Sequence, residues 1–166
     1  MKKKLSSVSF WLIVFFSIVA VEAYSAFAQS EVVGSWKNAS IGAISYQNRV
    51  TGSTKPGRGS IFAYKFLPNG NYEFVGYMEV TMYNCTTTLF NNITGKYRVS
   101  GSTIELAPSR DFWKNTNSCA ASGNKQQLKT PTRKSLEFVT RTDNYGKQLL
   151  CLADGSSQET CYKREE

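Results

Sequence analysis

The feature that most constrains the fold is a two-residue period of apolar side chains on either side of a tight turn. Between Ser60 and Met82, aromatic and other apolar residues recur at every second position, and Pro68-Asn69-Gly70 separates the two runs. Asn-Gly supplies the positive φ angles of a type I′ turn, and strict alternation is typical of a half-buried strand. The segment therefore predicts a β-hairpin with these residues on one face: Phe62, Tyr64, Phe66, Tyr72, Phe74, Gly76, Met78, Val80 and Met82.

Other short strands of the same kind follow one another along the chain. They are expected at residues 32–40, 86–90, 95–99, 103–107, 135–141, 147–152 and 158–164, with Asn91-Asn92 breaking the chain after the second of these. Evenly spaced strands with hairpin connections predict an all-β fold, either a sandwich or a barrel. We expect an antiparallel up-and-down β-barrel of about eight strands. Barrel closure leaves no free sheet edges, so we also expect a monomer.

The first residues have the pattern of a targeting signal. Three lysines at positions 2–4 precede an apolar run over residues 10–21, and Ala26-Phe27-Ala28 offers a cleavage site. This pattern predicts a signal peptide at residues 1–28 and one domain at residues 29–166, either secreted or periplasmic. An uncleaved anchor is the alternative. Glu22 leaves the run shorter than the roughly 20 apolar residues of a membrane span, so we expect no span after cleavage.

All four cysteines fall within residues 29–166. An even number of cysteines in an exported domain predicts two disulfides, and three connectivities are open. The turn sequence between Cys151 and Cys161 favours a bridge between these two, which leaves Cys85 to pair with Cys119. There is no CxxC pair and no histidine in the chain, so we expect neither a metal site nor another cofactor.

The absence of histidine also bears on catalysis. It excludes Ser-His-Asp and Cys-His mechanisms. Glu73 and Glu79 share one strand face six residues apart. They would be about 20 Å apart, too far for a glycosidase pair. We therefore expect that the protein is not an enzyme.

Two segments look like long loops, residues 46–60 and residues 108–131. They contain or adjoin the basic residues Lys55, Arg58, Lys125, Lys129, Arg133 and Lys134, within a chain of formal charge +8. One interpretation is a binding surface for an anionic or macromolecular partner. The alternative, a solvated surface, is favoured because no aromatic residues are interleaved with the basic ones, and we expect no nucleic-acid binding.

Two short motifs lie at the ends of the predicted domain. The first is Val33-Gly34-Ser35-Trp36-Lys37, and the second is Cys161-Tyr162-Lys163-Arg164. Together they resemble the lipocalin and lipocalin-like barrels. The segments 66–74 and 95–106 are similar to hairpins of small bacterial lipocalin-like domains. The resemblance implies that Trp36 plugs the closed end of the barrel and that Arg164 packs across its indole, a cation–π contact.

The aromatic face of the hairpin is the best candidate for a binding site. In a barrel it would line the interior with these candidate cavity residues: Phe62, Tyr64, Phe66, Tyr72, Phe74, Met78 and Tyr97. The expected function is binding of a small, mostly apolar molecule in the barrel. A barrel of eight strands can also be filled by its own side chains. In that case the alternative is a disulfide-braced interaction or inhibitor protein that uses its long loops.

Overall fold

The computed structural model describes residues 30–41, 46–47, 54–55, 59–155 and 158–165. The predicted signal peptide and much of the predicted loop 46–60 lie outside these residues. The chain forms strands almost throughout, with these bounds: β1 (Gly34–Ile41), β2 (Tyr46–Gln47), β3 (Thr54–Lys55), β4 (Gly59–Phe66), β5 (Asn71–Met82), β6 (Cys85–Ser100), β7 (Thr103–Asn117), the 3-10 helix η1 (Ala121–Gly123), β8 (Lys125–Lys129), β9 (Lys134–Thr142), β10 (Gln148–Ala153) and β11 (Thr160–Arg164).

Eight of these strands form a closed antiparallel barrel. The order around it is β6-β5-β4-β1-β11-β10-β9-β7, and pairing of β6 with β7 closes the ring. The predicted all-β antiparallel barrel of eight strands is therefore confirmed. Three strands lie outside the ring, since β2 pairs with β3 and β8 adds to the free edge of β7.

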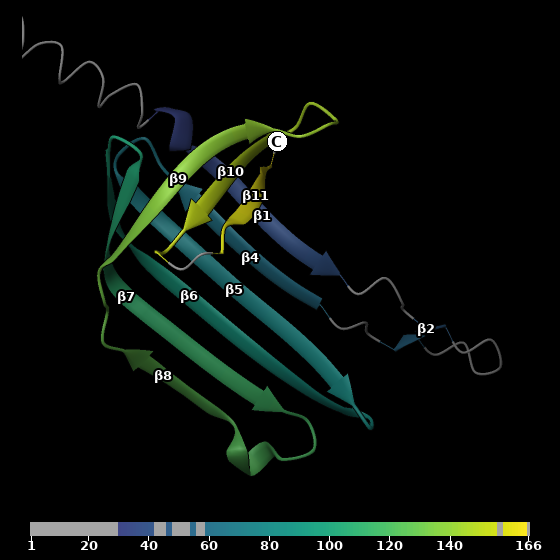
Figure 1. Cartoon of the computed structure of the whole chain (residues 1–166). Helices are drawn as coiled ribbons and strands as arrows, with labels where there is room; N and C mark the ends of the chain where they lie inside the picture. Colours follow the sequence, from purple (N-terminus) through teal and green to yellow (C-terminus); the bar gives the residue numbers. More distant parts are fainter. Residues whose placement is uncertain (1–29, 42–45, 48–53, 56–58, 156–157, 166) are drawn as a thin grey trace, which may run out of the picture.

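The ring is closed at one end only, because its strands differ greatly in length. β6 has 16 residues and β7 has 15, whereas β10 has 6 and β11 has 5. β9 pairs with β7 only over Thr103–Leu106, and β11 pairs with β1 only at Trp36 and Lys37. Beyond these pairs, β5, β6 and β7 continue well past β10 and β11 (Figure 1). The molecule is thus a short barrel prolonged on one side by an open sheet.

The closed end holds the hydrophobic core. It is formed by these buried residues: Val32, Trp36, Phe66, Tyr72, Tyr97, Val99, Ile104, Leu106, Leu136, Leu150, Leu152 and Tyr162. Trp36 is 1% exposed, and its indole Nε1 donates a hydrogen bond to the carbonyl of Val32 at 2.7 Å. The indole N–H is therefore paired although the side chain is buried.

The predicted contact between Trp36 and Arg164 is present. The guanidinium carbon lies 5.2 Å from the indole centroid, within cation–π range. Arg164 also donates hydrogen bonds to the side-chain oxygen of Gln148 at 2.6 Å and to the carbonyl of Val33 at 3.1 Å. Gly34 makes room for it, since a Cβ there would meet the guanidinium at 3.3 Å, and its φ of +144° disfavours other residues.

Two predictions are wrong, one of a break between strands and one of a long loop. Asn91-Asn92 does not break the chain, because β6 runs through both residues. Their side chains bond across the sheet, with Asn91 donating to Asp111 and Asn92 to Glu73, which offsets the poor strand propensity of asparagine. The segment 108–131 is not a long loop either. Its first ten residues complete β7, and residues 125–129 form β8.

Both disulfides have the expected partners. Cys85 and Cys119 have Cα atoms 5.3 Å apart, and their bridge ties the start of β6 to the connection between β7 and β8. Cys151 and Cys161 lie directly opposite each other on β10 and β11, with Cα atoms 3.9 Å apart. One bridge therefore braces the closed ring, and the other braces its open extension.

Candidate functional site

A half-open cavity of about 520 Å³ lies where the ring ends and the open sheet begins. Its walls come from the inner faces of β4 to β7 and from the segment that joins β8 to β9. The lining is mostly apolar, with a smaller polar part, and comprises Phe62, Tyr64, Tyr72, Phe74, Gly76, Met78, Leu89, Asn91, Ile93, Leu106, Pro108, Asp111, Trp113, Lys129, Thr130, Thr132 and Lys134.

Five of the seven predicted cavity residues line this space: Phe62, Tyr64, Tyr72, Phe74 and Met78. Phe66 and Tyr97 do not. They pack against each other with ring centroids 4.9 Å apart, and they are only 1% and 6% exposed. Their position near the closed end explains the difference, because the complete ring there is filled by side chains.

The aromatic wall is an ordered stack of rings along β4 and β5. Tyr64 and Phe74 have ring centroids 4.7 Å apart, and Phe62 lies nearly parallel to Phe74 at 6.4 Å. Gly76 lies beside them and leaves space, since a Cβ at this position would come within 3.3 Å of the Phe74 ring. The missing side chain thus sets the width of the cavity.

The polar and indole groups from β7 were not predicted to be in the cavity. A β-bulge at Ser109 brings them there, because Gly95 pairs with Pro108 whereas Thr94 pairs with Arg110. The extra residue reverses which positions of β7 face inward. Before the bulge Leu106 and Pro108 face the interior, and after it Asp111 and Trp113 do. The alternation of apolar and polar residues along the sequence does not predict this reversal.

Asp111 is held by a neighbour on β6. The Asn91 amide nitrogen donates to Asp111 Oδ1 at 2.9 Å and to the carbonyl of Phe112 at 3.0 Å. One amide hydrogen bond of Asn91 therefore holds this carboxylate, and the other holds the β7 backbone next to it. Asp111 is the one acidic residue among the described residues that line the cavity.

Two tyrosine residues, Tyr64 and Tyr72, belong to this lining. Burial, and secondarily the charge of Asp111, raises the pKa of Tyr72 to about 12. Burial also raises the pKa of Tyr64, with smaller contributions from Tyr162, Tyr72 and Asp154. Both hydroxyl groups are therefore protonated at neutral pH and can hydrogen-bond a ligand, but neither can act as a phenolate nucleophile there.

Lysine side chains flank the opening. The Lys129 ammonium lies 5.0 Å from the centre of the Trp113 ring, a cation–π contact across β7 and β8. No aromatic residue is interleaved with the basic ones in the sequence, but the fold brings this indole to Lys129 from the neighbouring strand. Lys134 lines the same cavity from the start of β9. Arg133 and Lys125 do not line it.

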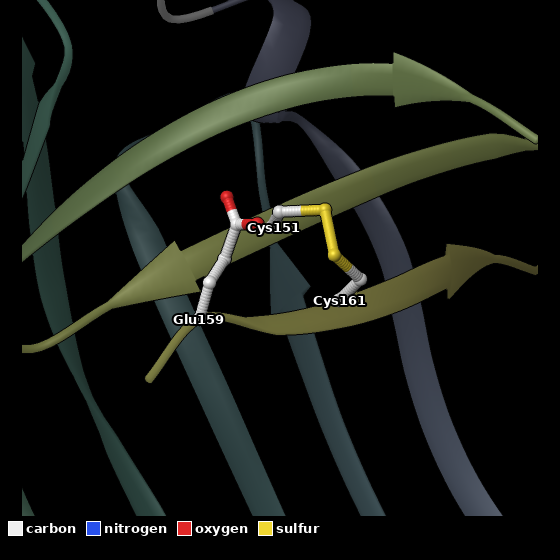
Figure 2. A group of neighbouring side chains, drawn as sticks. All are labelled: Cys151, Glu159 and Cys161. Carbon is white, nitrogen blue, oxygen red and sulfur yellow. A yellow bond between two sulfur atoms is a disulfide. The ribbon is translucent and has the colours of Figure 1, made fainter. Parts of the chain in front are cut away.

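Among the residues that the structure describes, one group of potential metal ligands lies on the barrel wall, at Cys151, Glu159 and Cys161 (Figure 2). The two sulfur atoms are joined in a disulfide and so are not thiolates. The Glu159 carboxylate accepts two hydrogen bonds from the Arg141 guanidinium, at 2.9 and 3.1 Å. This group is therefore a disulfide beside an ion pair, and its donors are engaged.

These features define the class of the protein: an eight-stranded antiparallel β-barrel, closed at one end and with an aromatic-lined cavity at the other. In the part of the chain that the structure describes, no helix is both long and apolar enough to cross a membrane. No protein-family model, curated protein or solved structure matches the chain.

Proposed function

We propose that the protein is an exported, lipocalin-like barrel that holds a small, mostly apolar molecule. The observation that carries this proposal is the cavity of about 520 Å³, walled by aromatic side chains. Small-molecule sites commonly have volumes of about 300–1,000 Å³, with an apolar lining and a few polar groups. Here those polar groups are the hydroxyls of Tyr64 and Tyr72 and the Asn91–Asp111 pair.

Three further observations support export and the lipocalin-like assignment. Disulfides persist in oxidising compartments, and the chain has two of them. The contact between Trp36 and Arg164 matches what the lipocalin resemblance implies for the closed end. The apolar run and cleavage motif in residues 1–28 agree with export.

The test is to purify the protein from its native cells, extract it with organic solvent and analyse the extract by mass spectrometry. A Gly76→Leu variant should fill the cavity, because its side chain would project among Phe62 and Phe74. Ala63→Leu is the matched control, since this residue lies on the outer face of β4. We expect one compound to be recovered at about one molecule per barrel from wild type and from Ala63→Leu, but not from Gly76→Leu.

Far-UV circular dichroism of both variants should match the wild-type spectrum, so that loss of the compound reports on the cavity rather than on folding. An extract from wild type with no bound compound, or equal recovery from the Gly76→Leu variant, would contradict the proposal.

A further inference from the structure

We propose that the ligand is a ring-bearing molecule with one anionic group, and that Lys129 and Lys134 bind this group at the cavity opening. This inference rests on the proposed function and specifies the ligand chemistry. It is carried by the charges and rings that the fold brings together, from the β4–β5 hairpin and from β7, β8 and the start of β9.

The first argument is the balance of charge. Among the described residues that line the cavity, Lys129 and Lys134 are positive and Asp111 alone is negative. Asp111 already accepts a hydrogen bond from Asn91, which occupies part of its capacity. The lining therefore has a net positive charge, which attracts an anion and opposes an amine.

The second argument is the position of the two ammonium groups. Lys129 pairs with Asp111 in the register of β7 and β8, so its side chain starts on the inner face of the sheet. Lys134 begins β9 after a four-residue connection whose Thr130 and Thr132 also line the cavity. Both lysines are exposed, so an anion can reach them without the large desolvation cost of a buried charge.

The third argument is the character of the apolar wall. Five aromatic ring systems line a cavity of this modest volume: Phe62, Tyr64, Tyr72, Phe74 and Trp113. Aromatic rings pair favourably in offset-stacked and edge-to-face arrangements, beyond the gain from burying their area. A flat ring system fits such a wall better than a flexible alkyl chain, which loses more conformational freedom when it is ordered.

Two fluorescent probes with the same ring system test the anionic group. 1-Anilinonaphthalene-8-sulfonate has a sulfonate, and N-phenyl-1-naphthylamine is its neutral counterpart. Titrations followed by fluorescence should give a Kd for the sulfonate probe about tenfold lower than the Kd for the neutral probe. This ratio corresponds to a difference in binding free energy of about 1.4 kcal/mol. Lys129→Gln and Lys134→Gln should each weaken sulfonate binding severalfold and leave the neutral probe unchanged.

Lys114→Gln is the matched control, because it removes the same charge from the outer face of β7. It should change neither Kd. Gly76→Leu should abolish binding of both probes, which shows that they occupy the cavity. Equal Kd values for the two probes in wild type, or the same loss with Lys114→Gln, would overturn the anionic group while leaving the proposed function intact.

Binding of neither probe to wild type would contradict the proposed function itself. Competition against the sulfonate probe then separates ring-bearing acids from alkyl acids. We expect 2-naphthoate to displace the probe at lower concentration than decanoate, and the reverse order would overturn the assignment of a ring-bearing ligand.

Discussion

Tyr72 lies where the filled core meets the cavity. Its side chain is only 4% exposed, its ring lies 6.3 Å from that of Phe66, and it also lines the cavity. Burial and the charge of Asp111 together raise its pKa to about 12. Tyr72 therefore places a protonated hydroxyl group in mostly apolar surroundings. Its ionisation is linked to the free energy of unfolding.

The pKa of Tyr72 predicts a loss of stability at alkaline pH. The unfolded chain releases this proton near pH 10, whereas the folded protein keeps it up to about pH 12. The stabilising effect is complete below pH 10 and disappears as pH rises to 12. Because two pKa units correspond to about 2.7 kcal/mol, wild type should lose about 2–3 kcal/mol more than Tyr72→Phe over this interval.

Urea denaturation at several pH values between 8 and 12 measures this difference. The free energy of unfolding should still decline in Tyr72→Phe, since burial also raises the pKa values of Tyr64 and Tyr162. Parallel curves for wild type and Tyr72→Phe across the whole range would contradict the linkage.

At the scale of elements, the bulge in β7 decides what the cavity contains. The backbones come very close there, since a Cβ on Gly95 would lie 2.4 Å from the carbonyl oxygen of Ala107. Ser109 is the extra residue, and its hydroxyl donates to the carbonyl of Thr94 at 3.2 Å. This one extra residue interrupts the alternation along β7, so Asp111 and Trp113 face inward.

Deletion of Ser109 should remove the bulge without turning the faces of β7 beyond it. Arg110 would then follow Pro108 directly and still pair with Thr94, so Asp111 and Trp113 would still face the cavity. We expect the sulfonate probe to bind this variant with an affinity close to that of wild type, as it should bind Ser109→Ala, which keeps the bulge. A tenfold or larger rise in the Kd after the deletion, about 1.4 kcal/mol, would contradict the assigned faces.

Strands β4 to β7 show where prediction from sequence succeeds and where it fails. The hairpin of β4 and β5 was predicted correctly in its place and its faces, because alternation is a local pattern. The predicted type I′ turn was wrong, since Gly70 has a positive φ but Asn69 does not, and the Gly70 nitrogen donates to the carbonyl of Leu67.

The continuation of β6 through Asn91 and Asn92 was not predicted, since it depends on partners at Asp111 and Glu73. A bulge depends likewise on the match between two strands, which residue alternation within one strand does not encode.

At the scale of the whole molecule, Trp36 joins the two ends of the chain. It lies on β1, pairs in register with Arg164 on the last strand and contacts its guanidinium. We expect Trp36→Ala to lower the free energy of unfolding by about 3–5 kcal/mol, as for other buried large aromatic residues. Arg164→Met should cost about 0.5–2 kcal/mol through loss of the cation–π contact, and Arg164→Lys should cost less.

Chemical denaturation of the three variants under the same conditions checks this order. If Trp36→Ala lowered the free energy of unfolding by less than about 1 kcal/mol, the result would contradict the role of Trp36 in closing the barrel.

The extent of the cavity also belongs to this scale. Alternation predicted correctly that Phe66 and Tyr97 face the interior, but not that the interior there is full. That outcome depends on where β9, β10 and β11 end relative to the longer β5, β6 and β7. Strand length is the combined result of all the pairings around the ring, so no single segment of the sequence determines it.

The pairing of β1 with β11 has a practical consequence for handling the protein. The backbone nitrogen of Glu165 donates a hydrogen bond to the carbonyl of Ser35 at 2.8 Å, and the Lys37 ammonium forms an ion pair with the Glu165 carboxylate at 3.0 Å. Both ends of the described residues therefore lie at the closed end, away from the turn between β5 and β6 (Figure 1). A tag, a surface linker or a fused reporter attached at either end would leave the opening free, and a short peptide joining these ends would allow circular permutation at the β5–β6 turn.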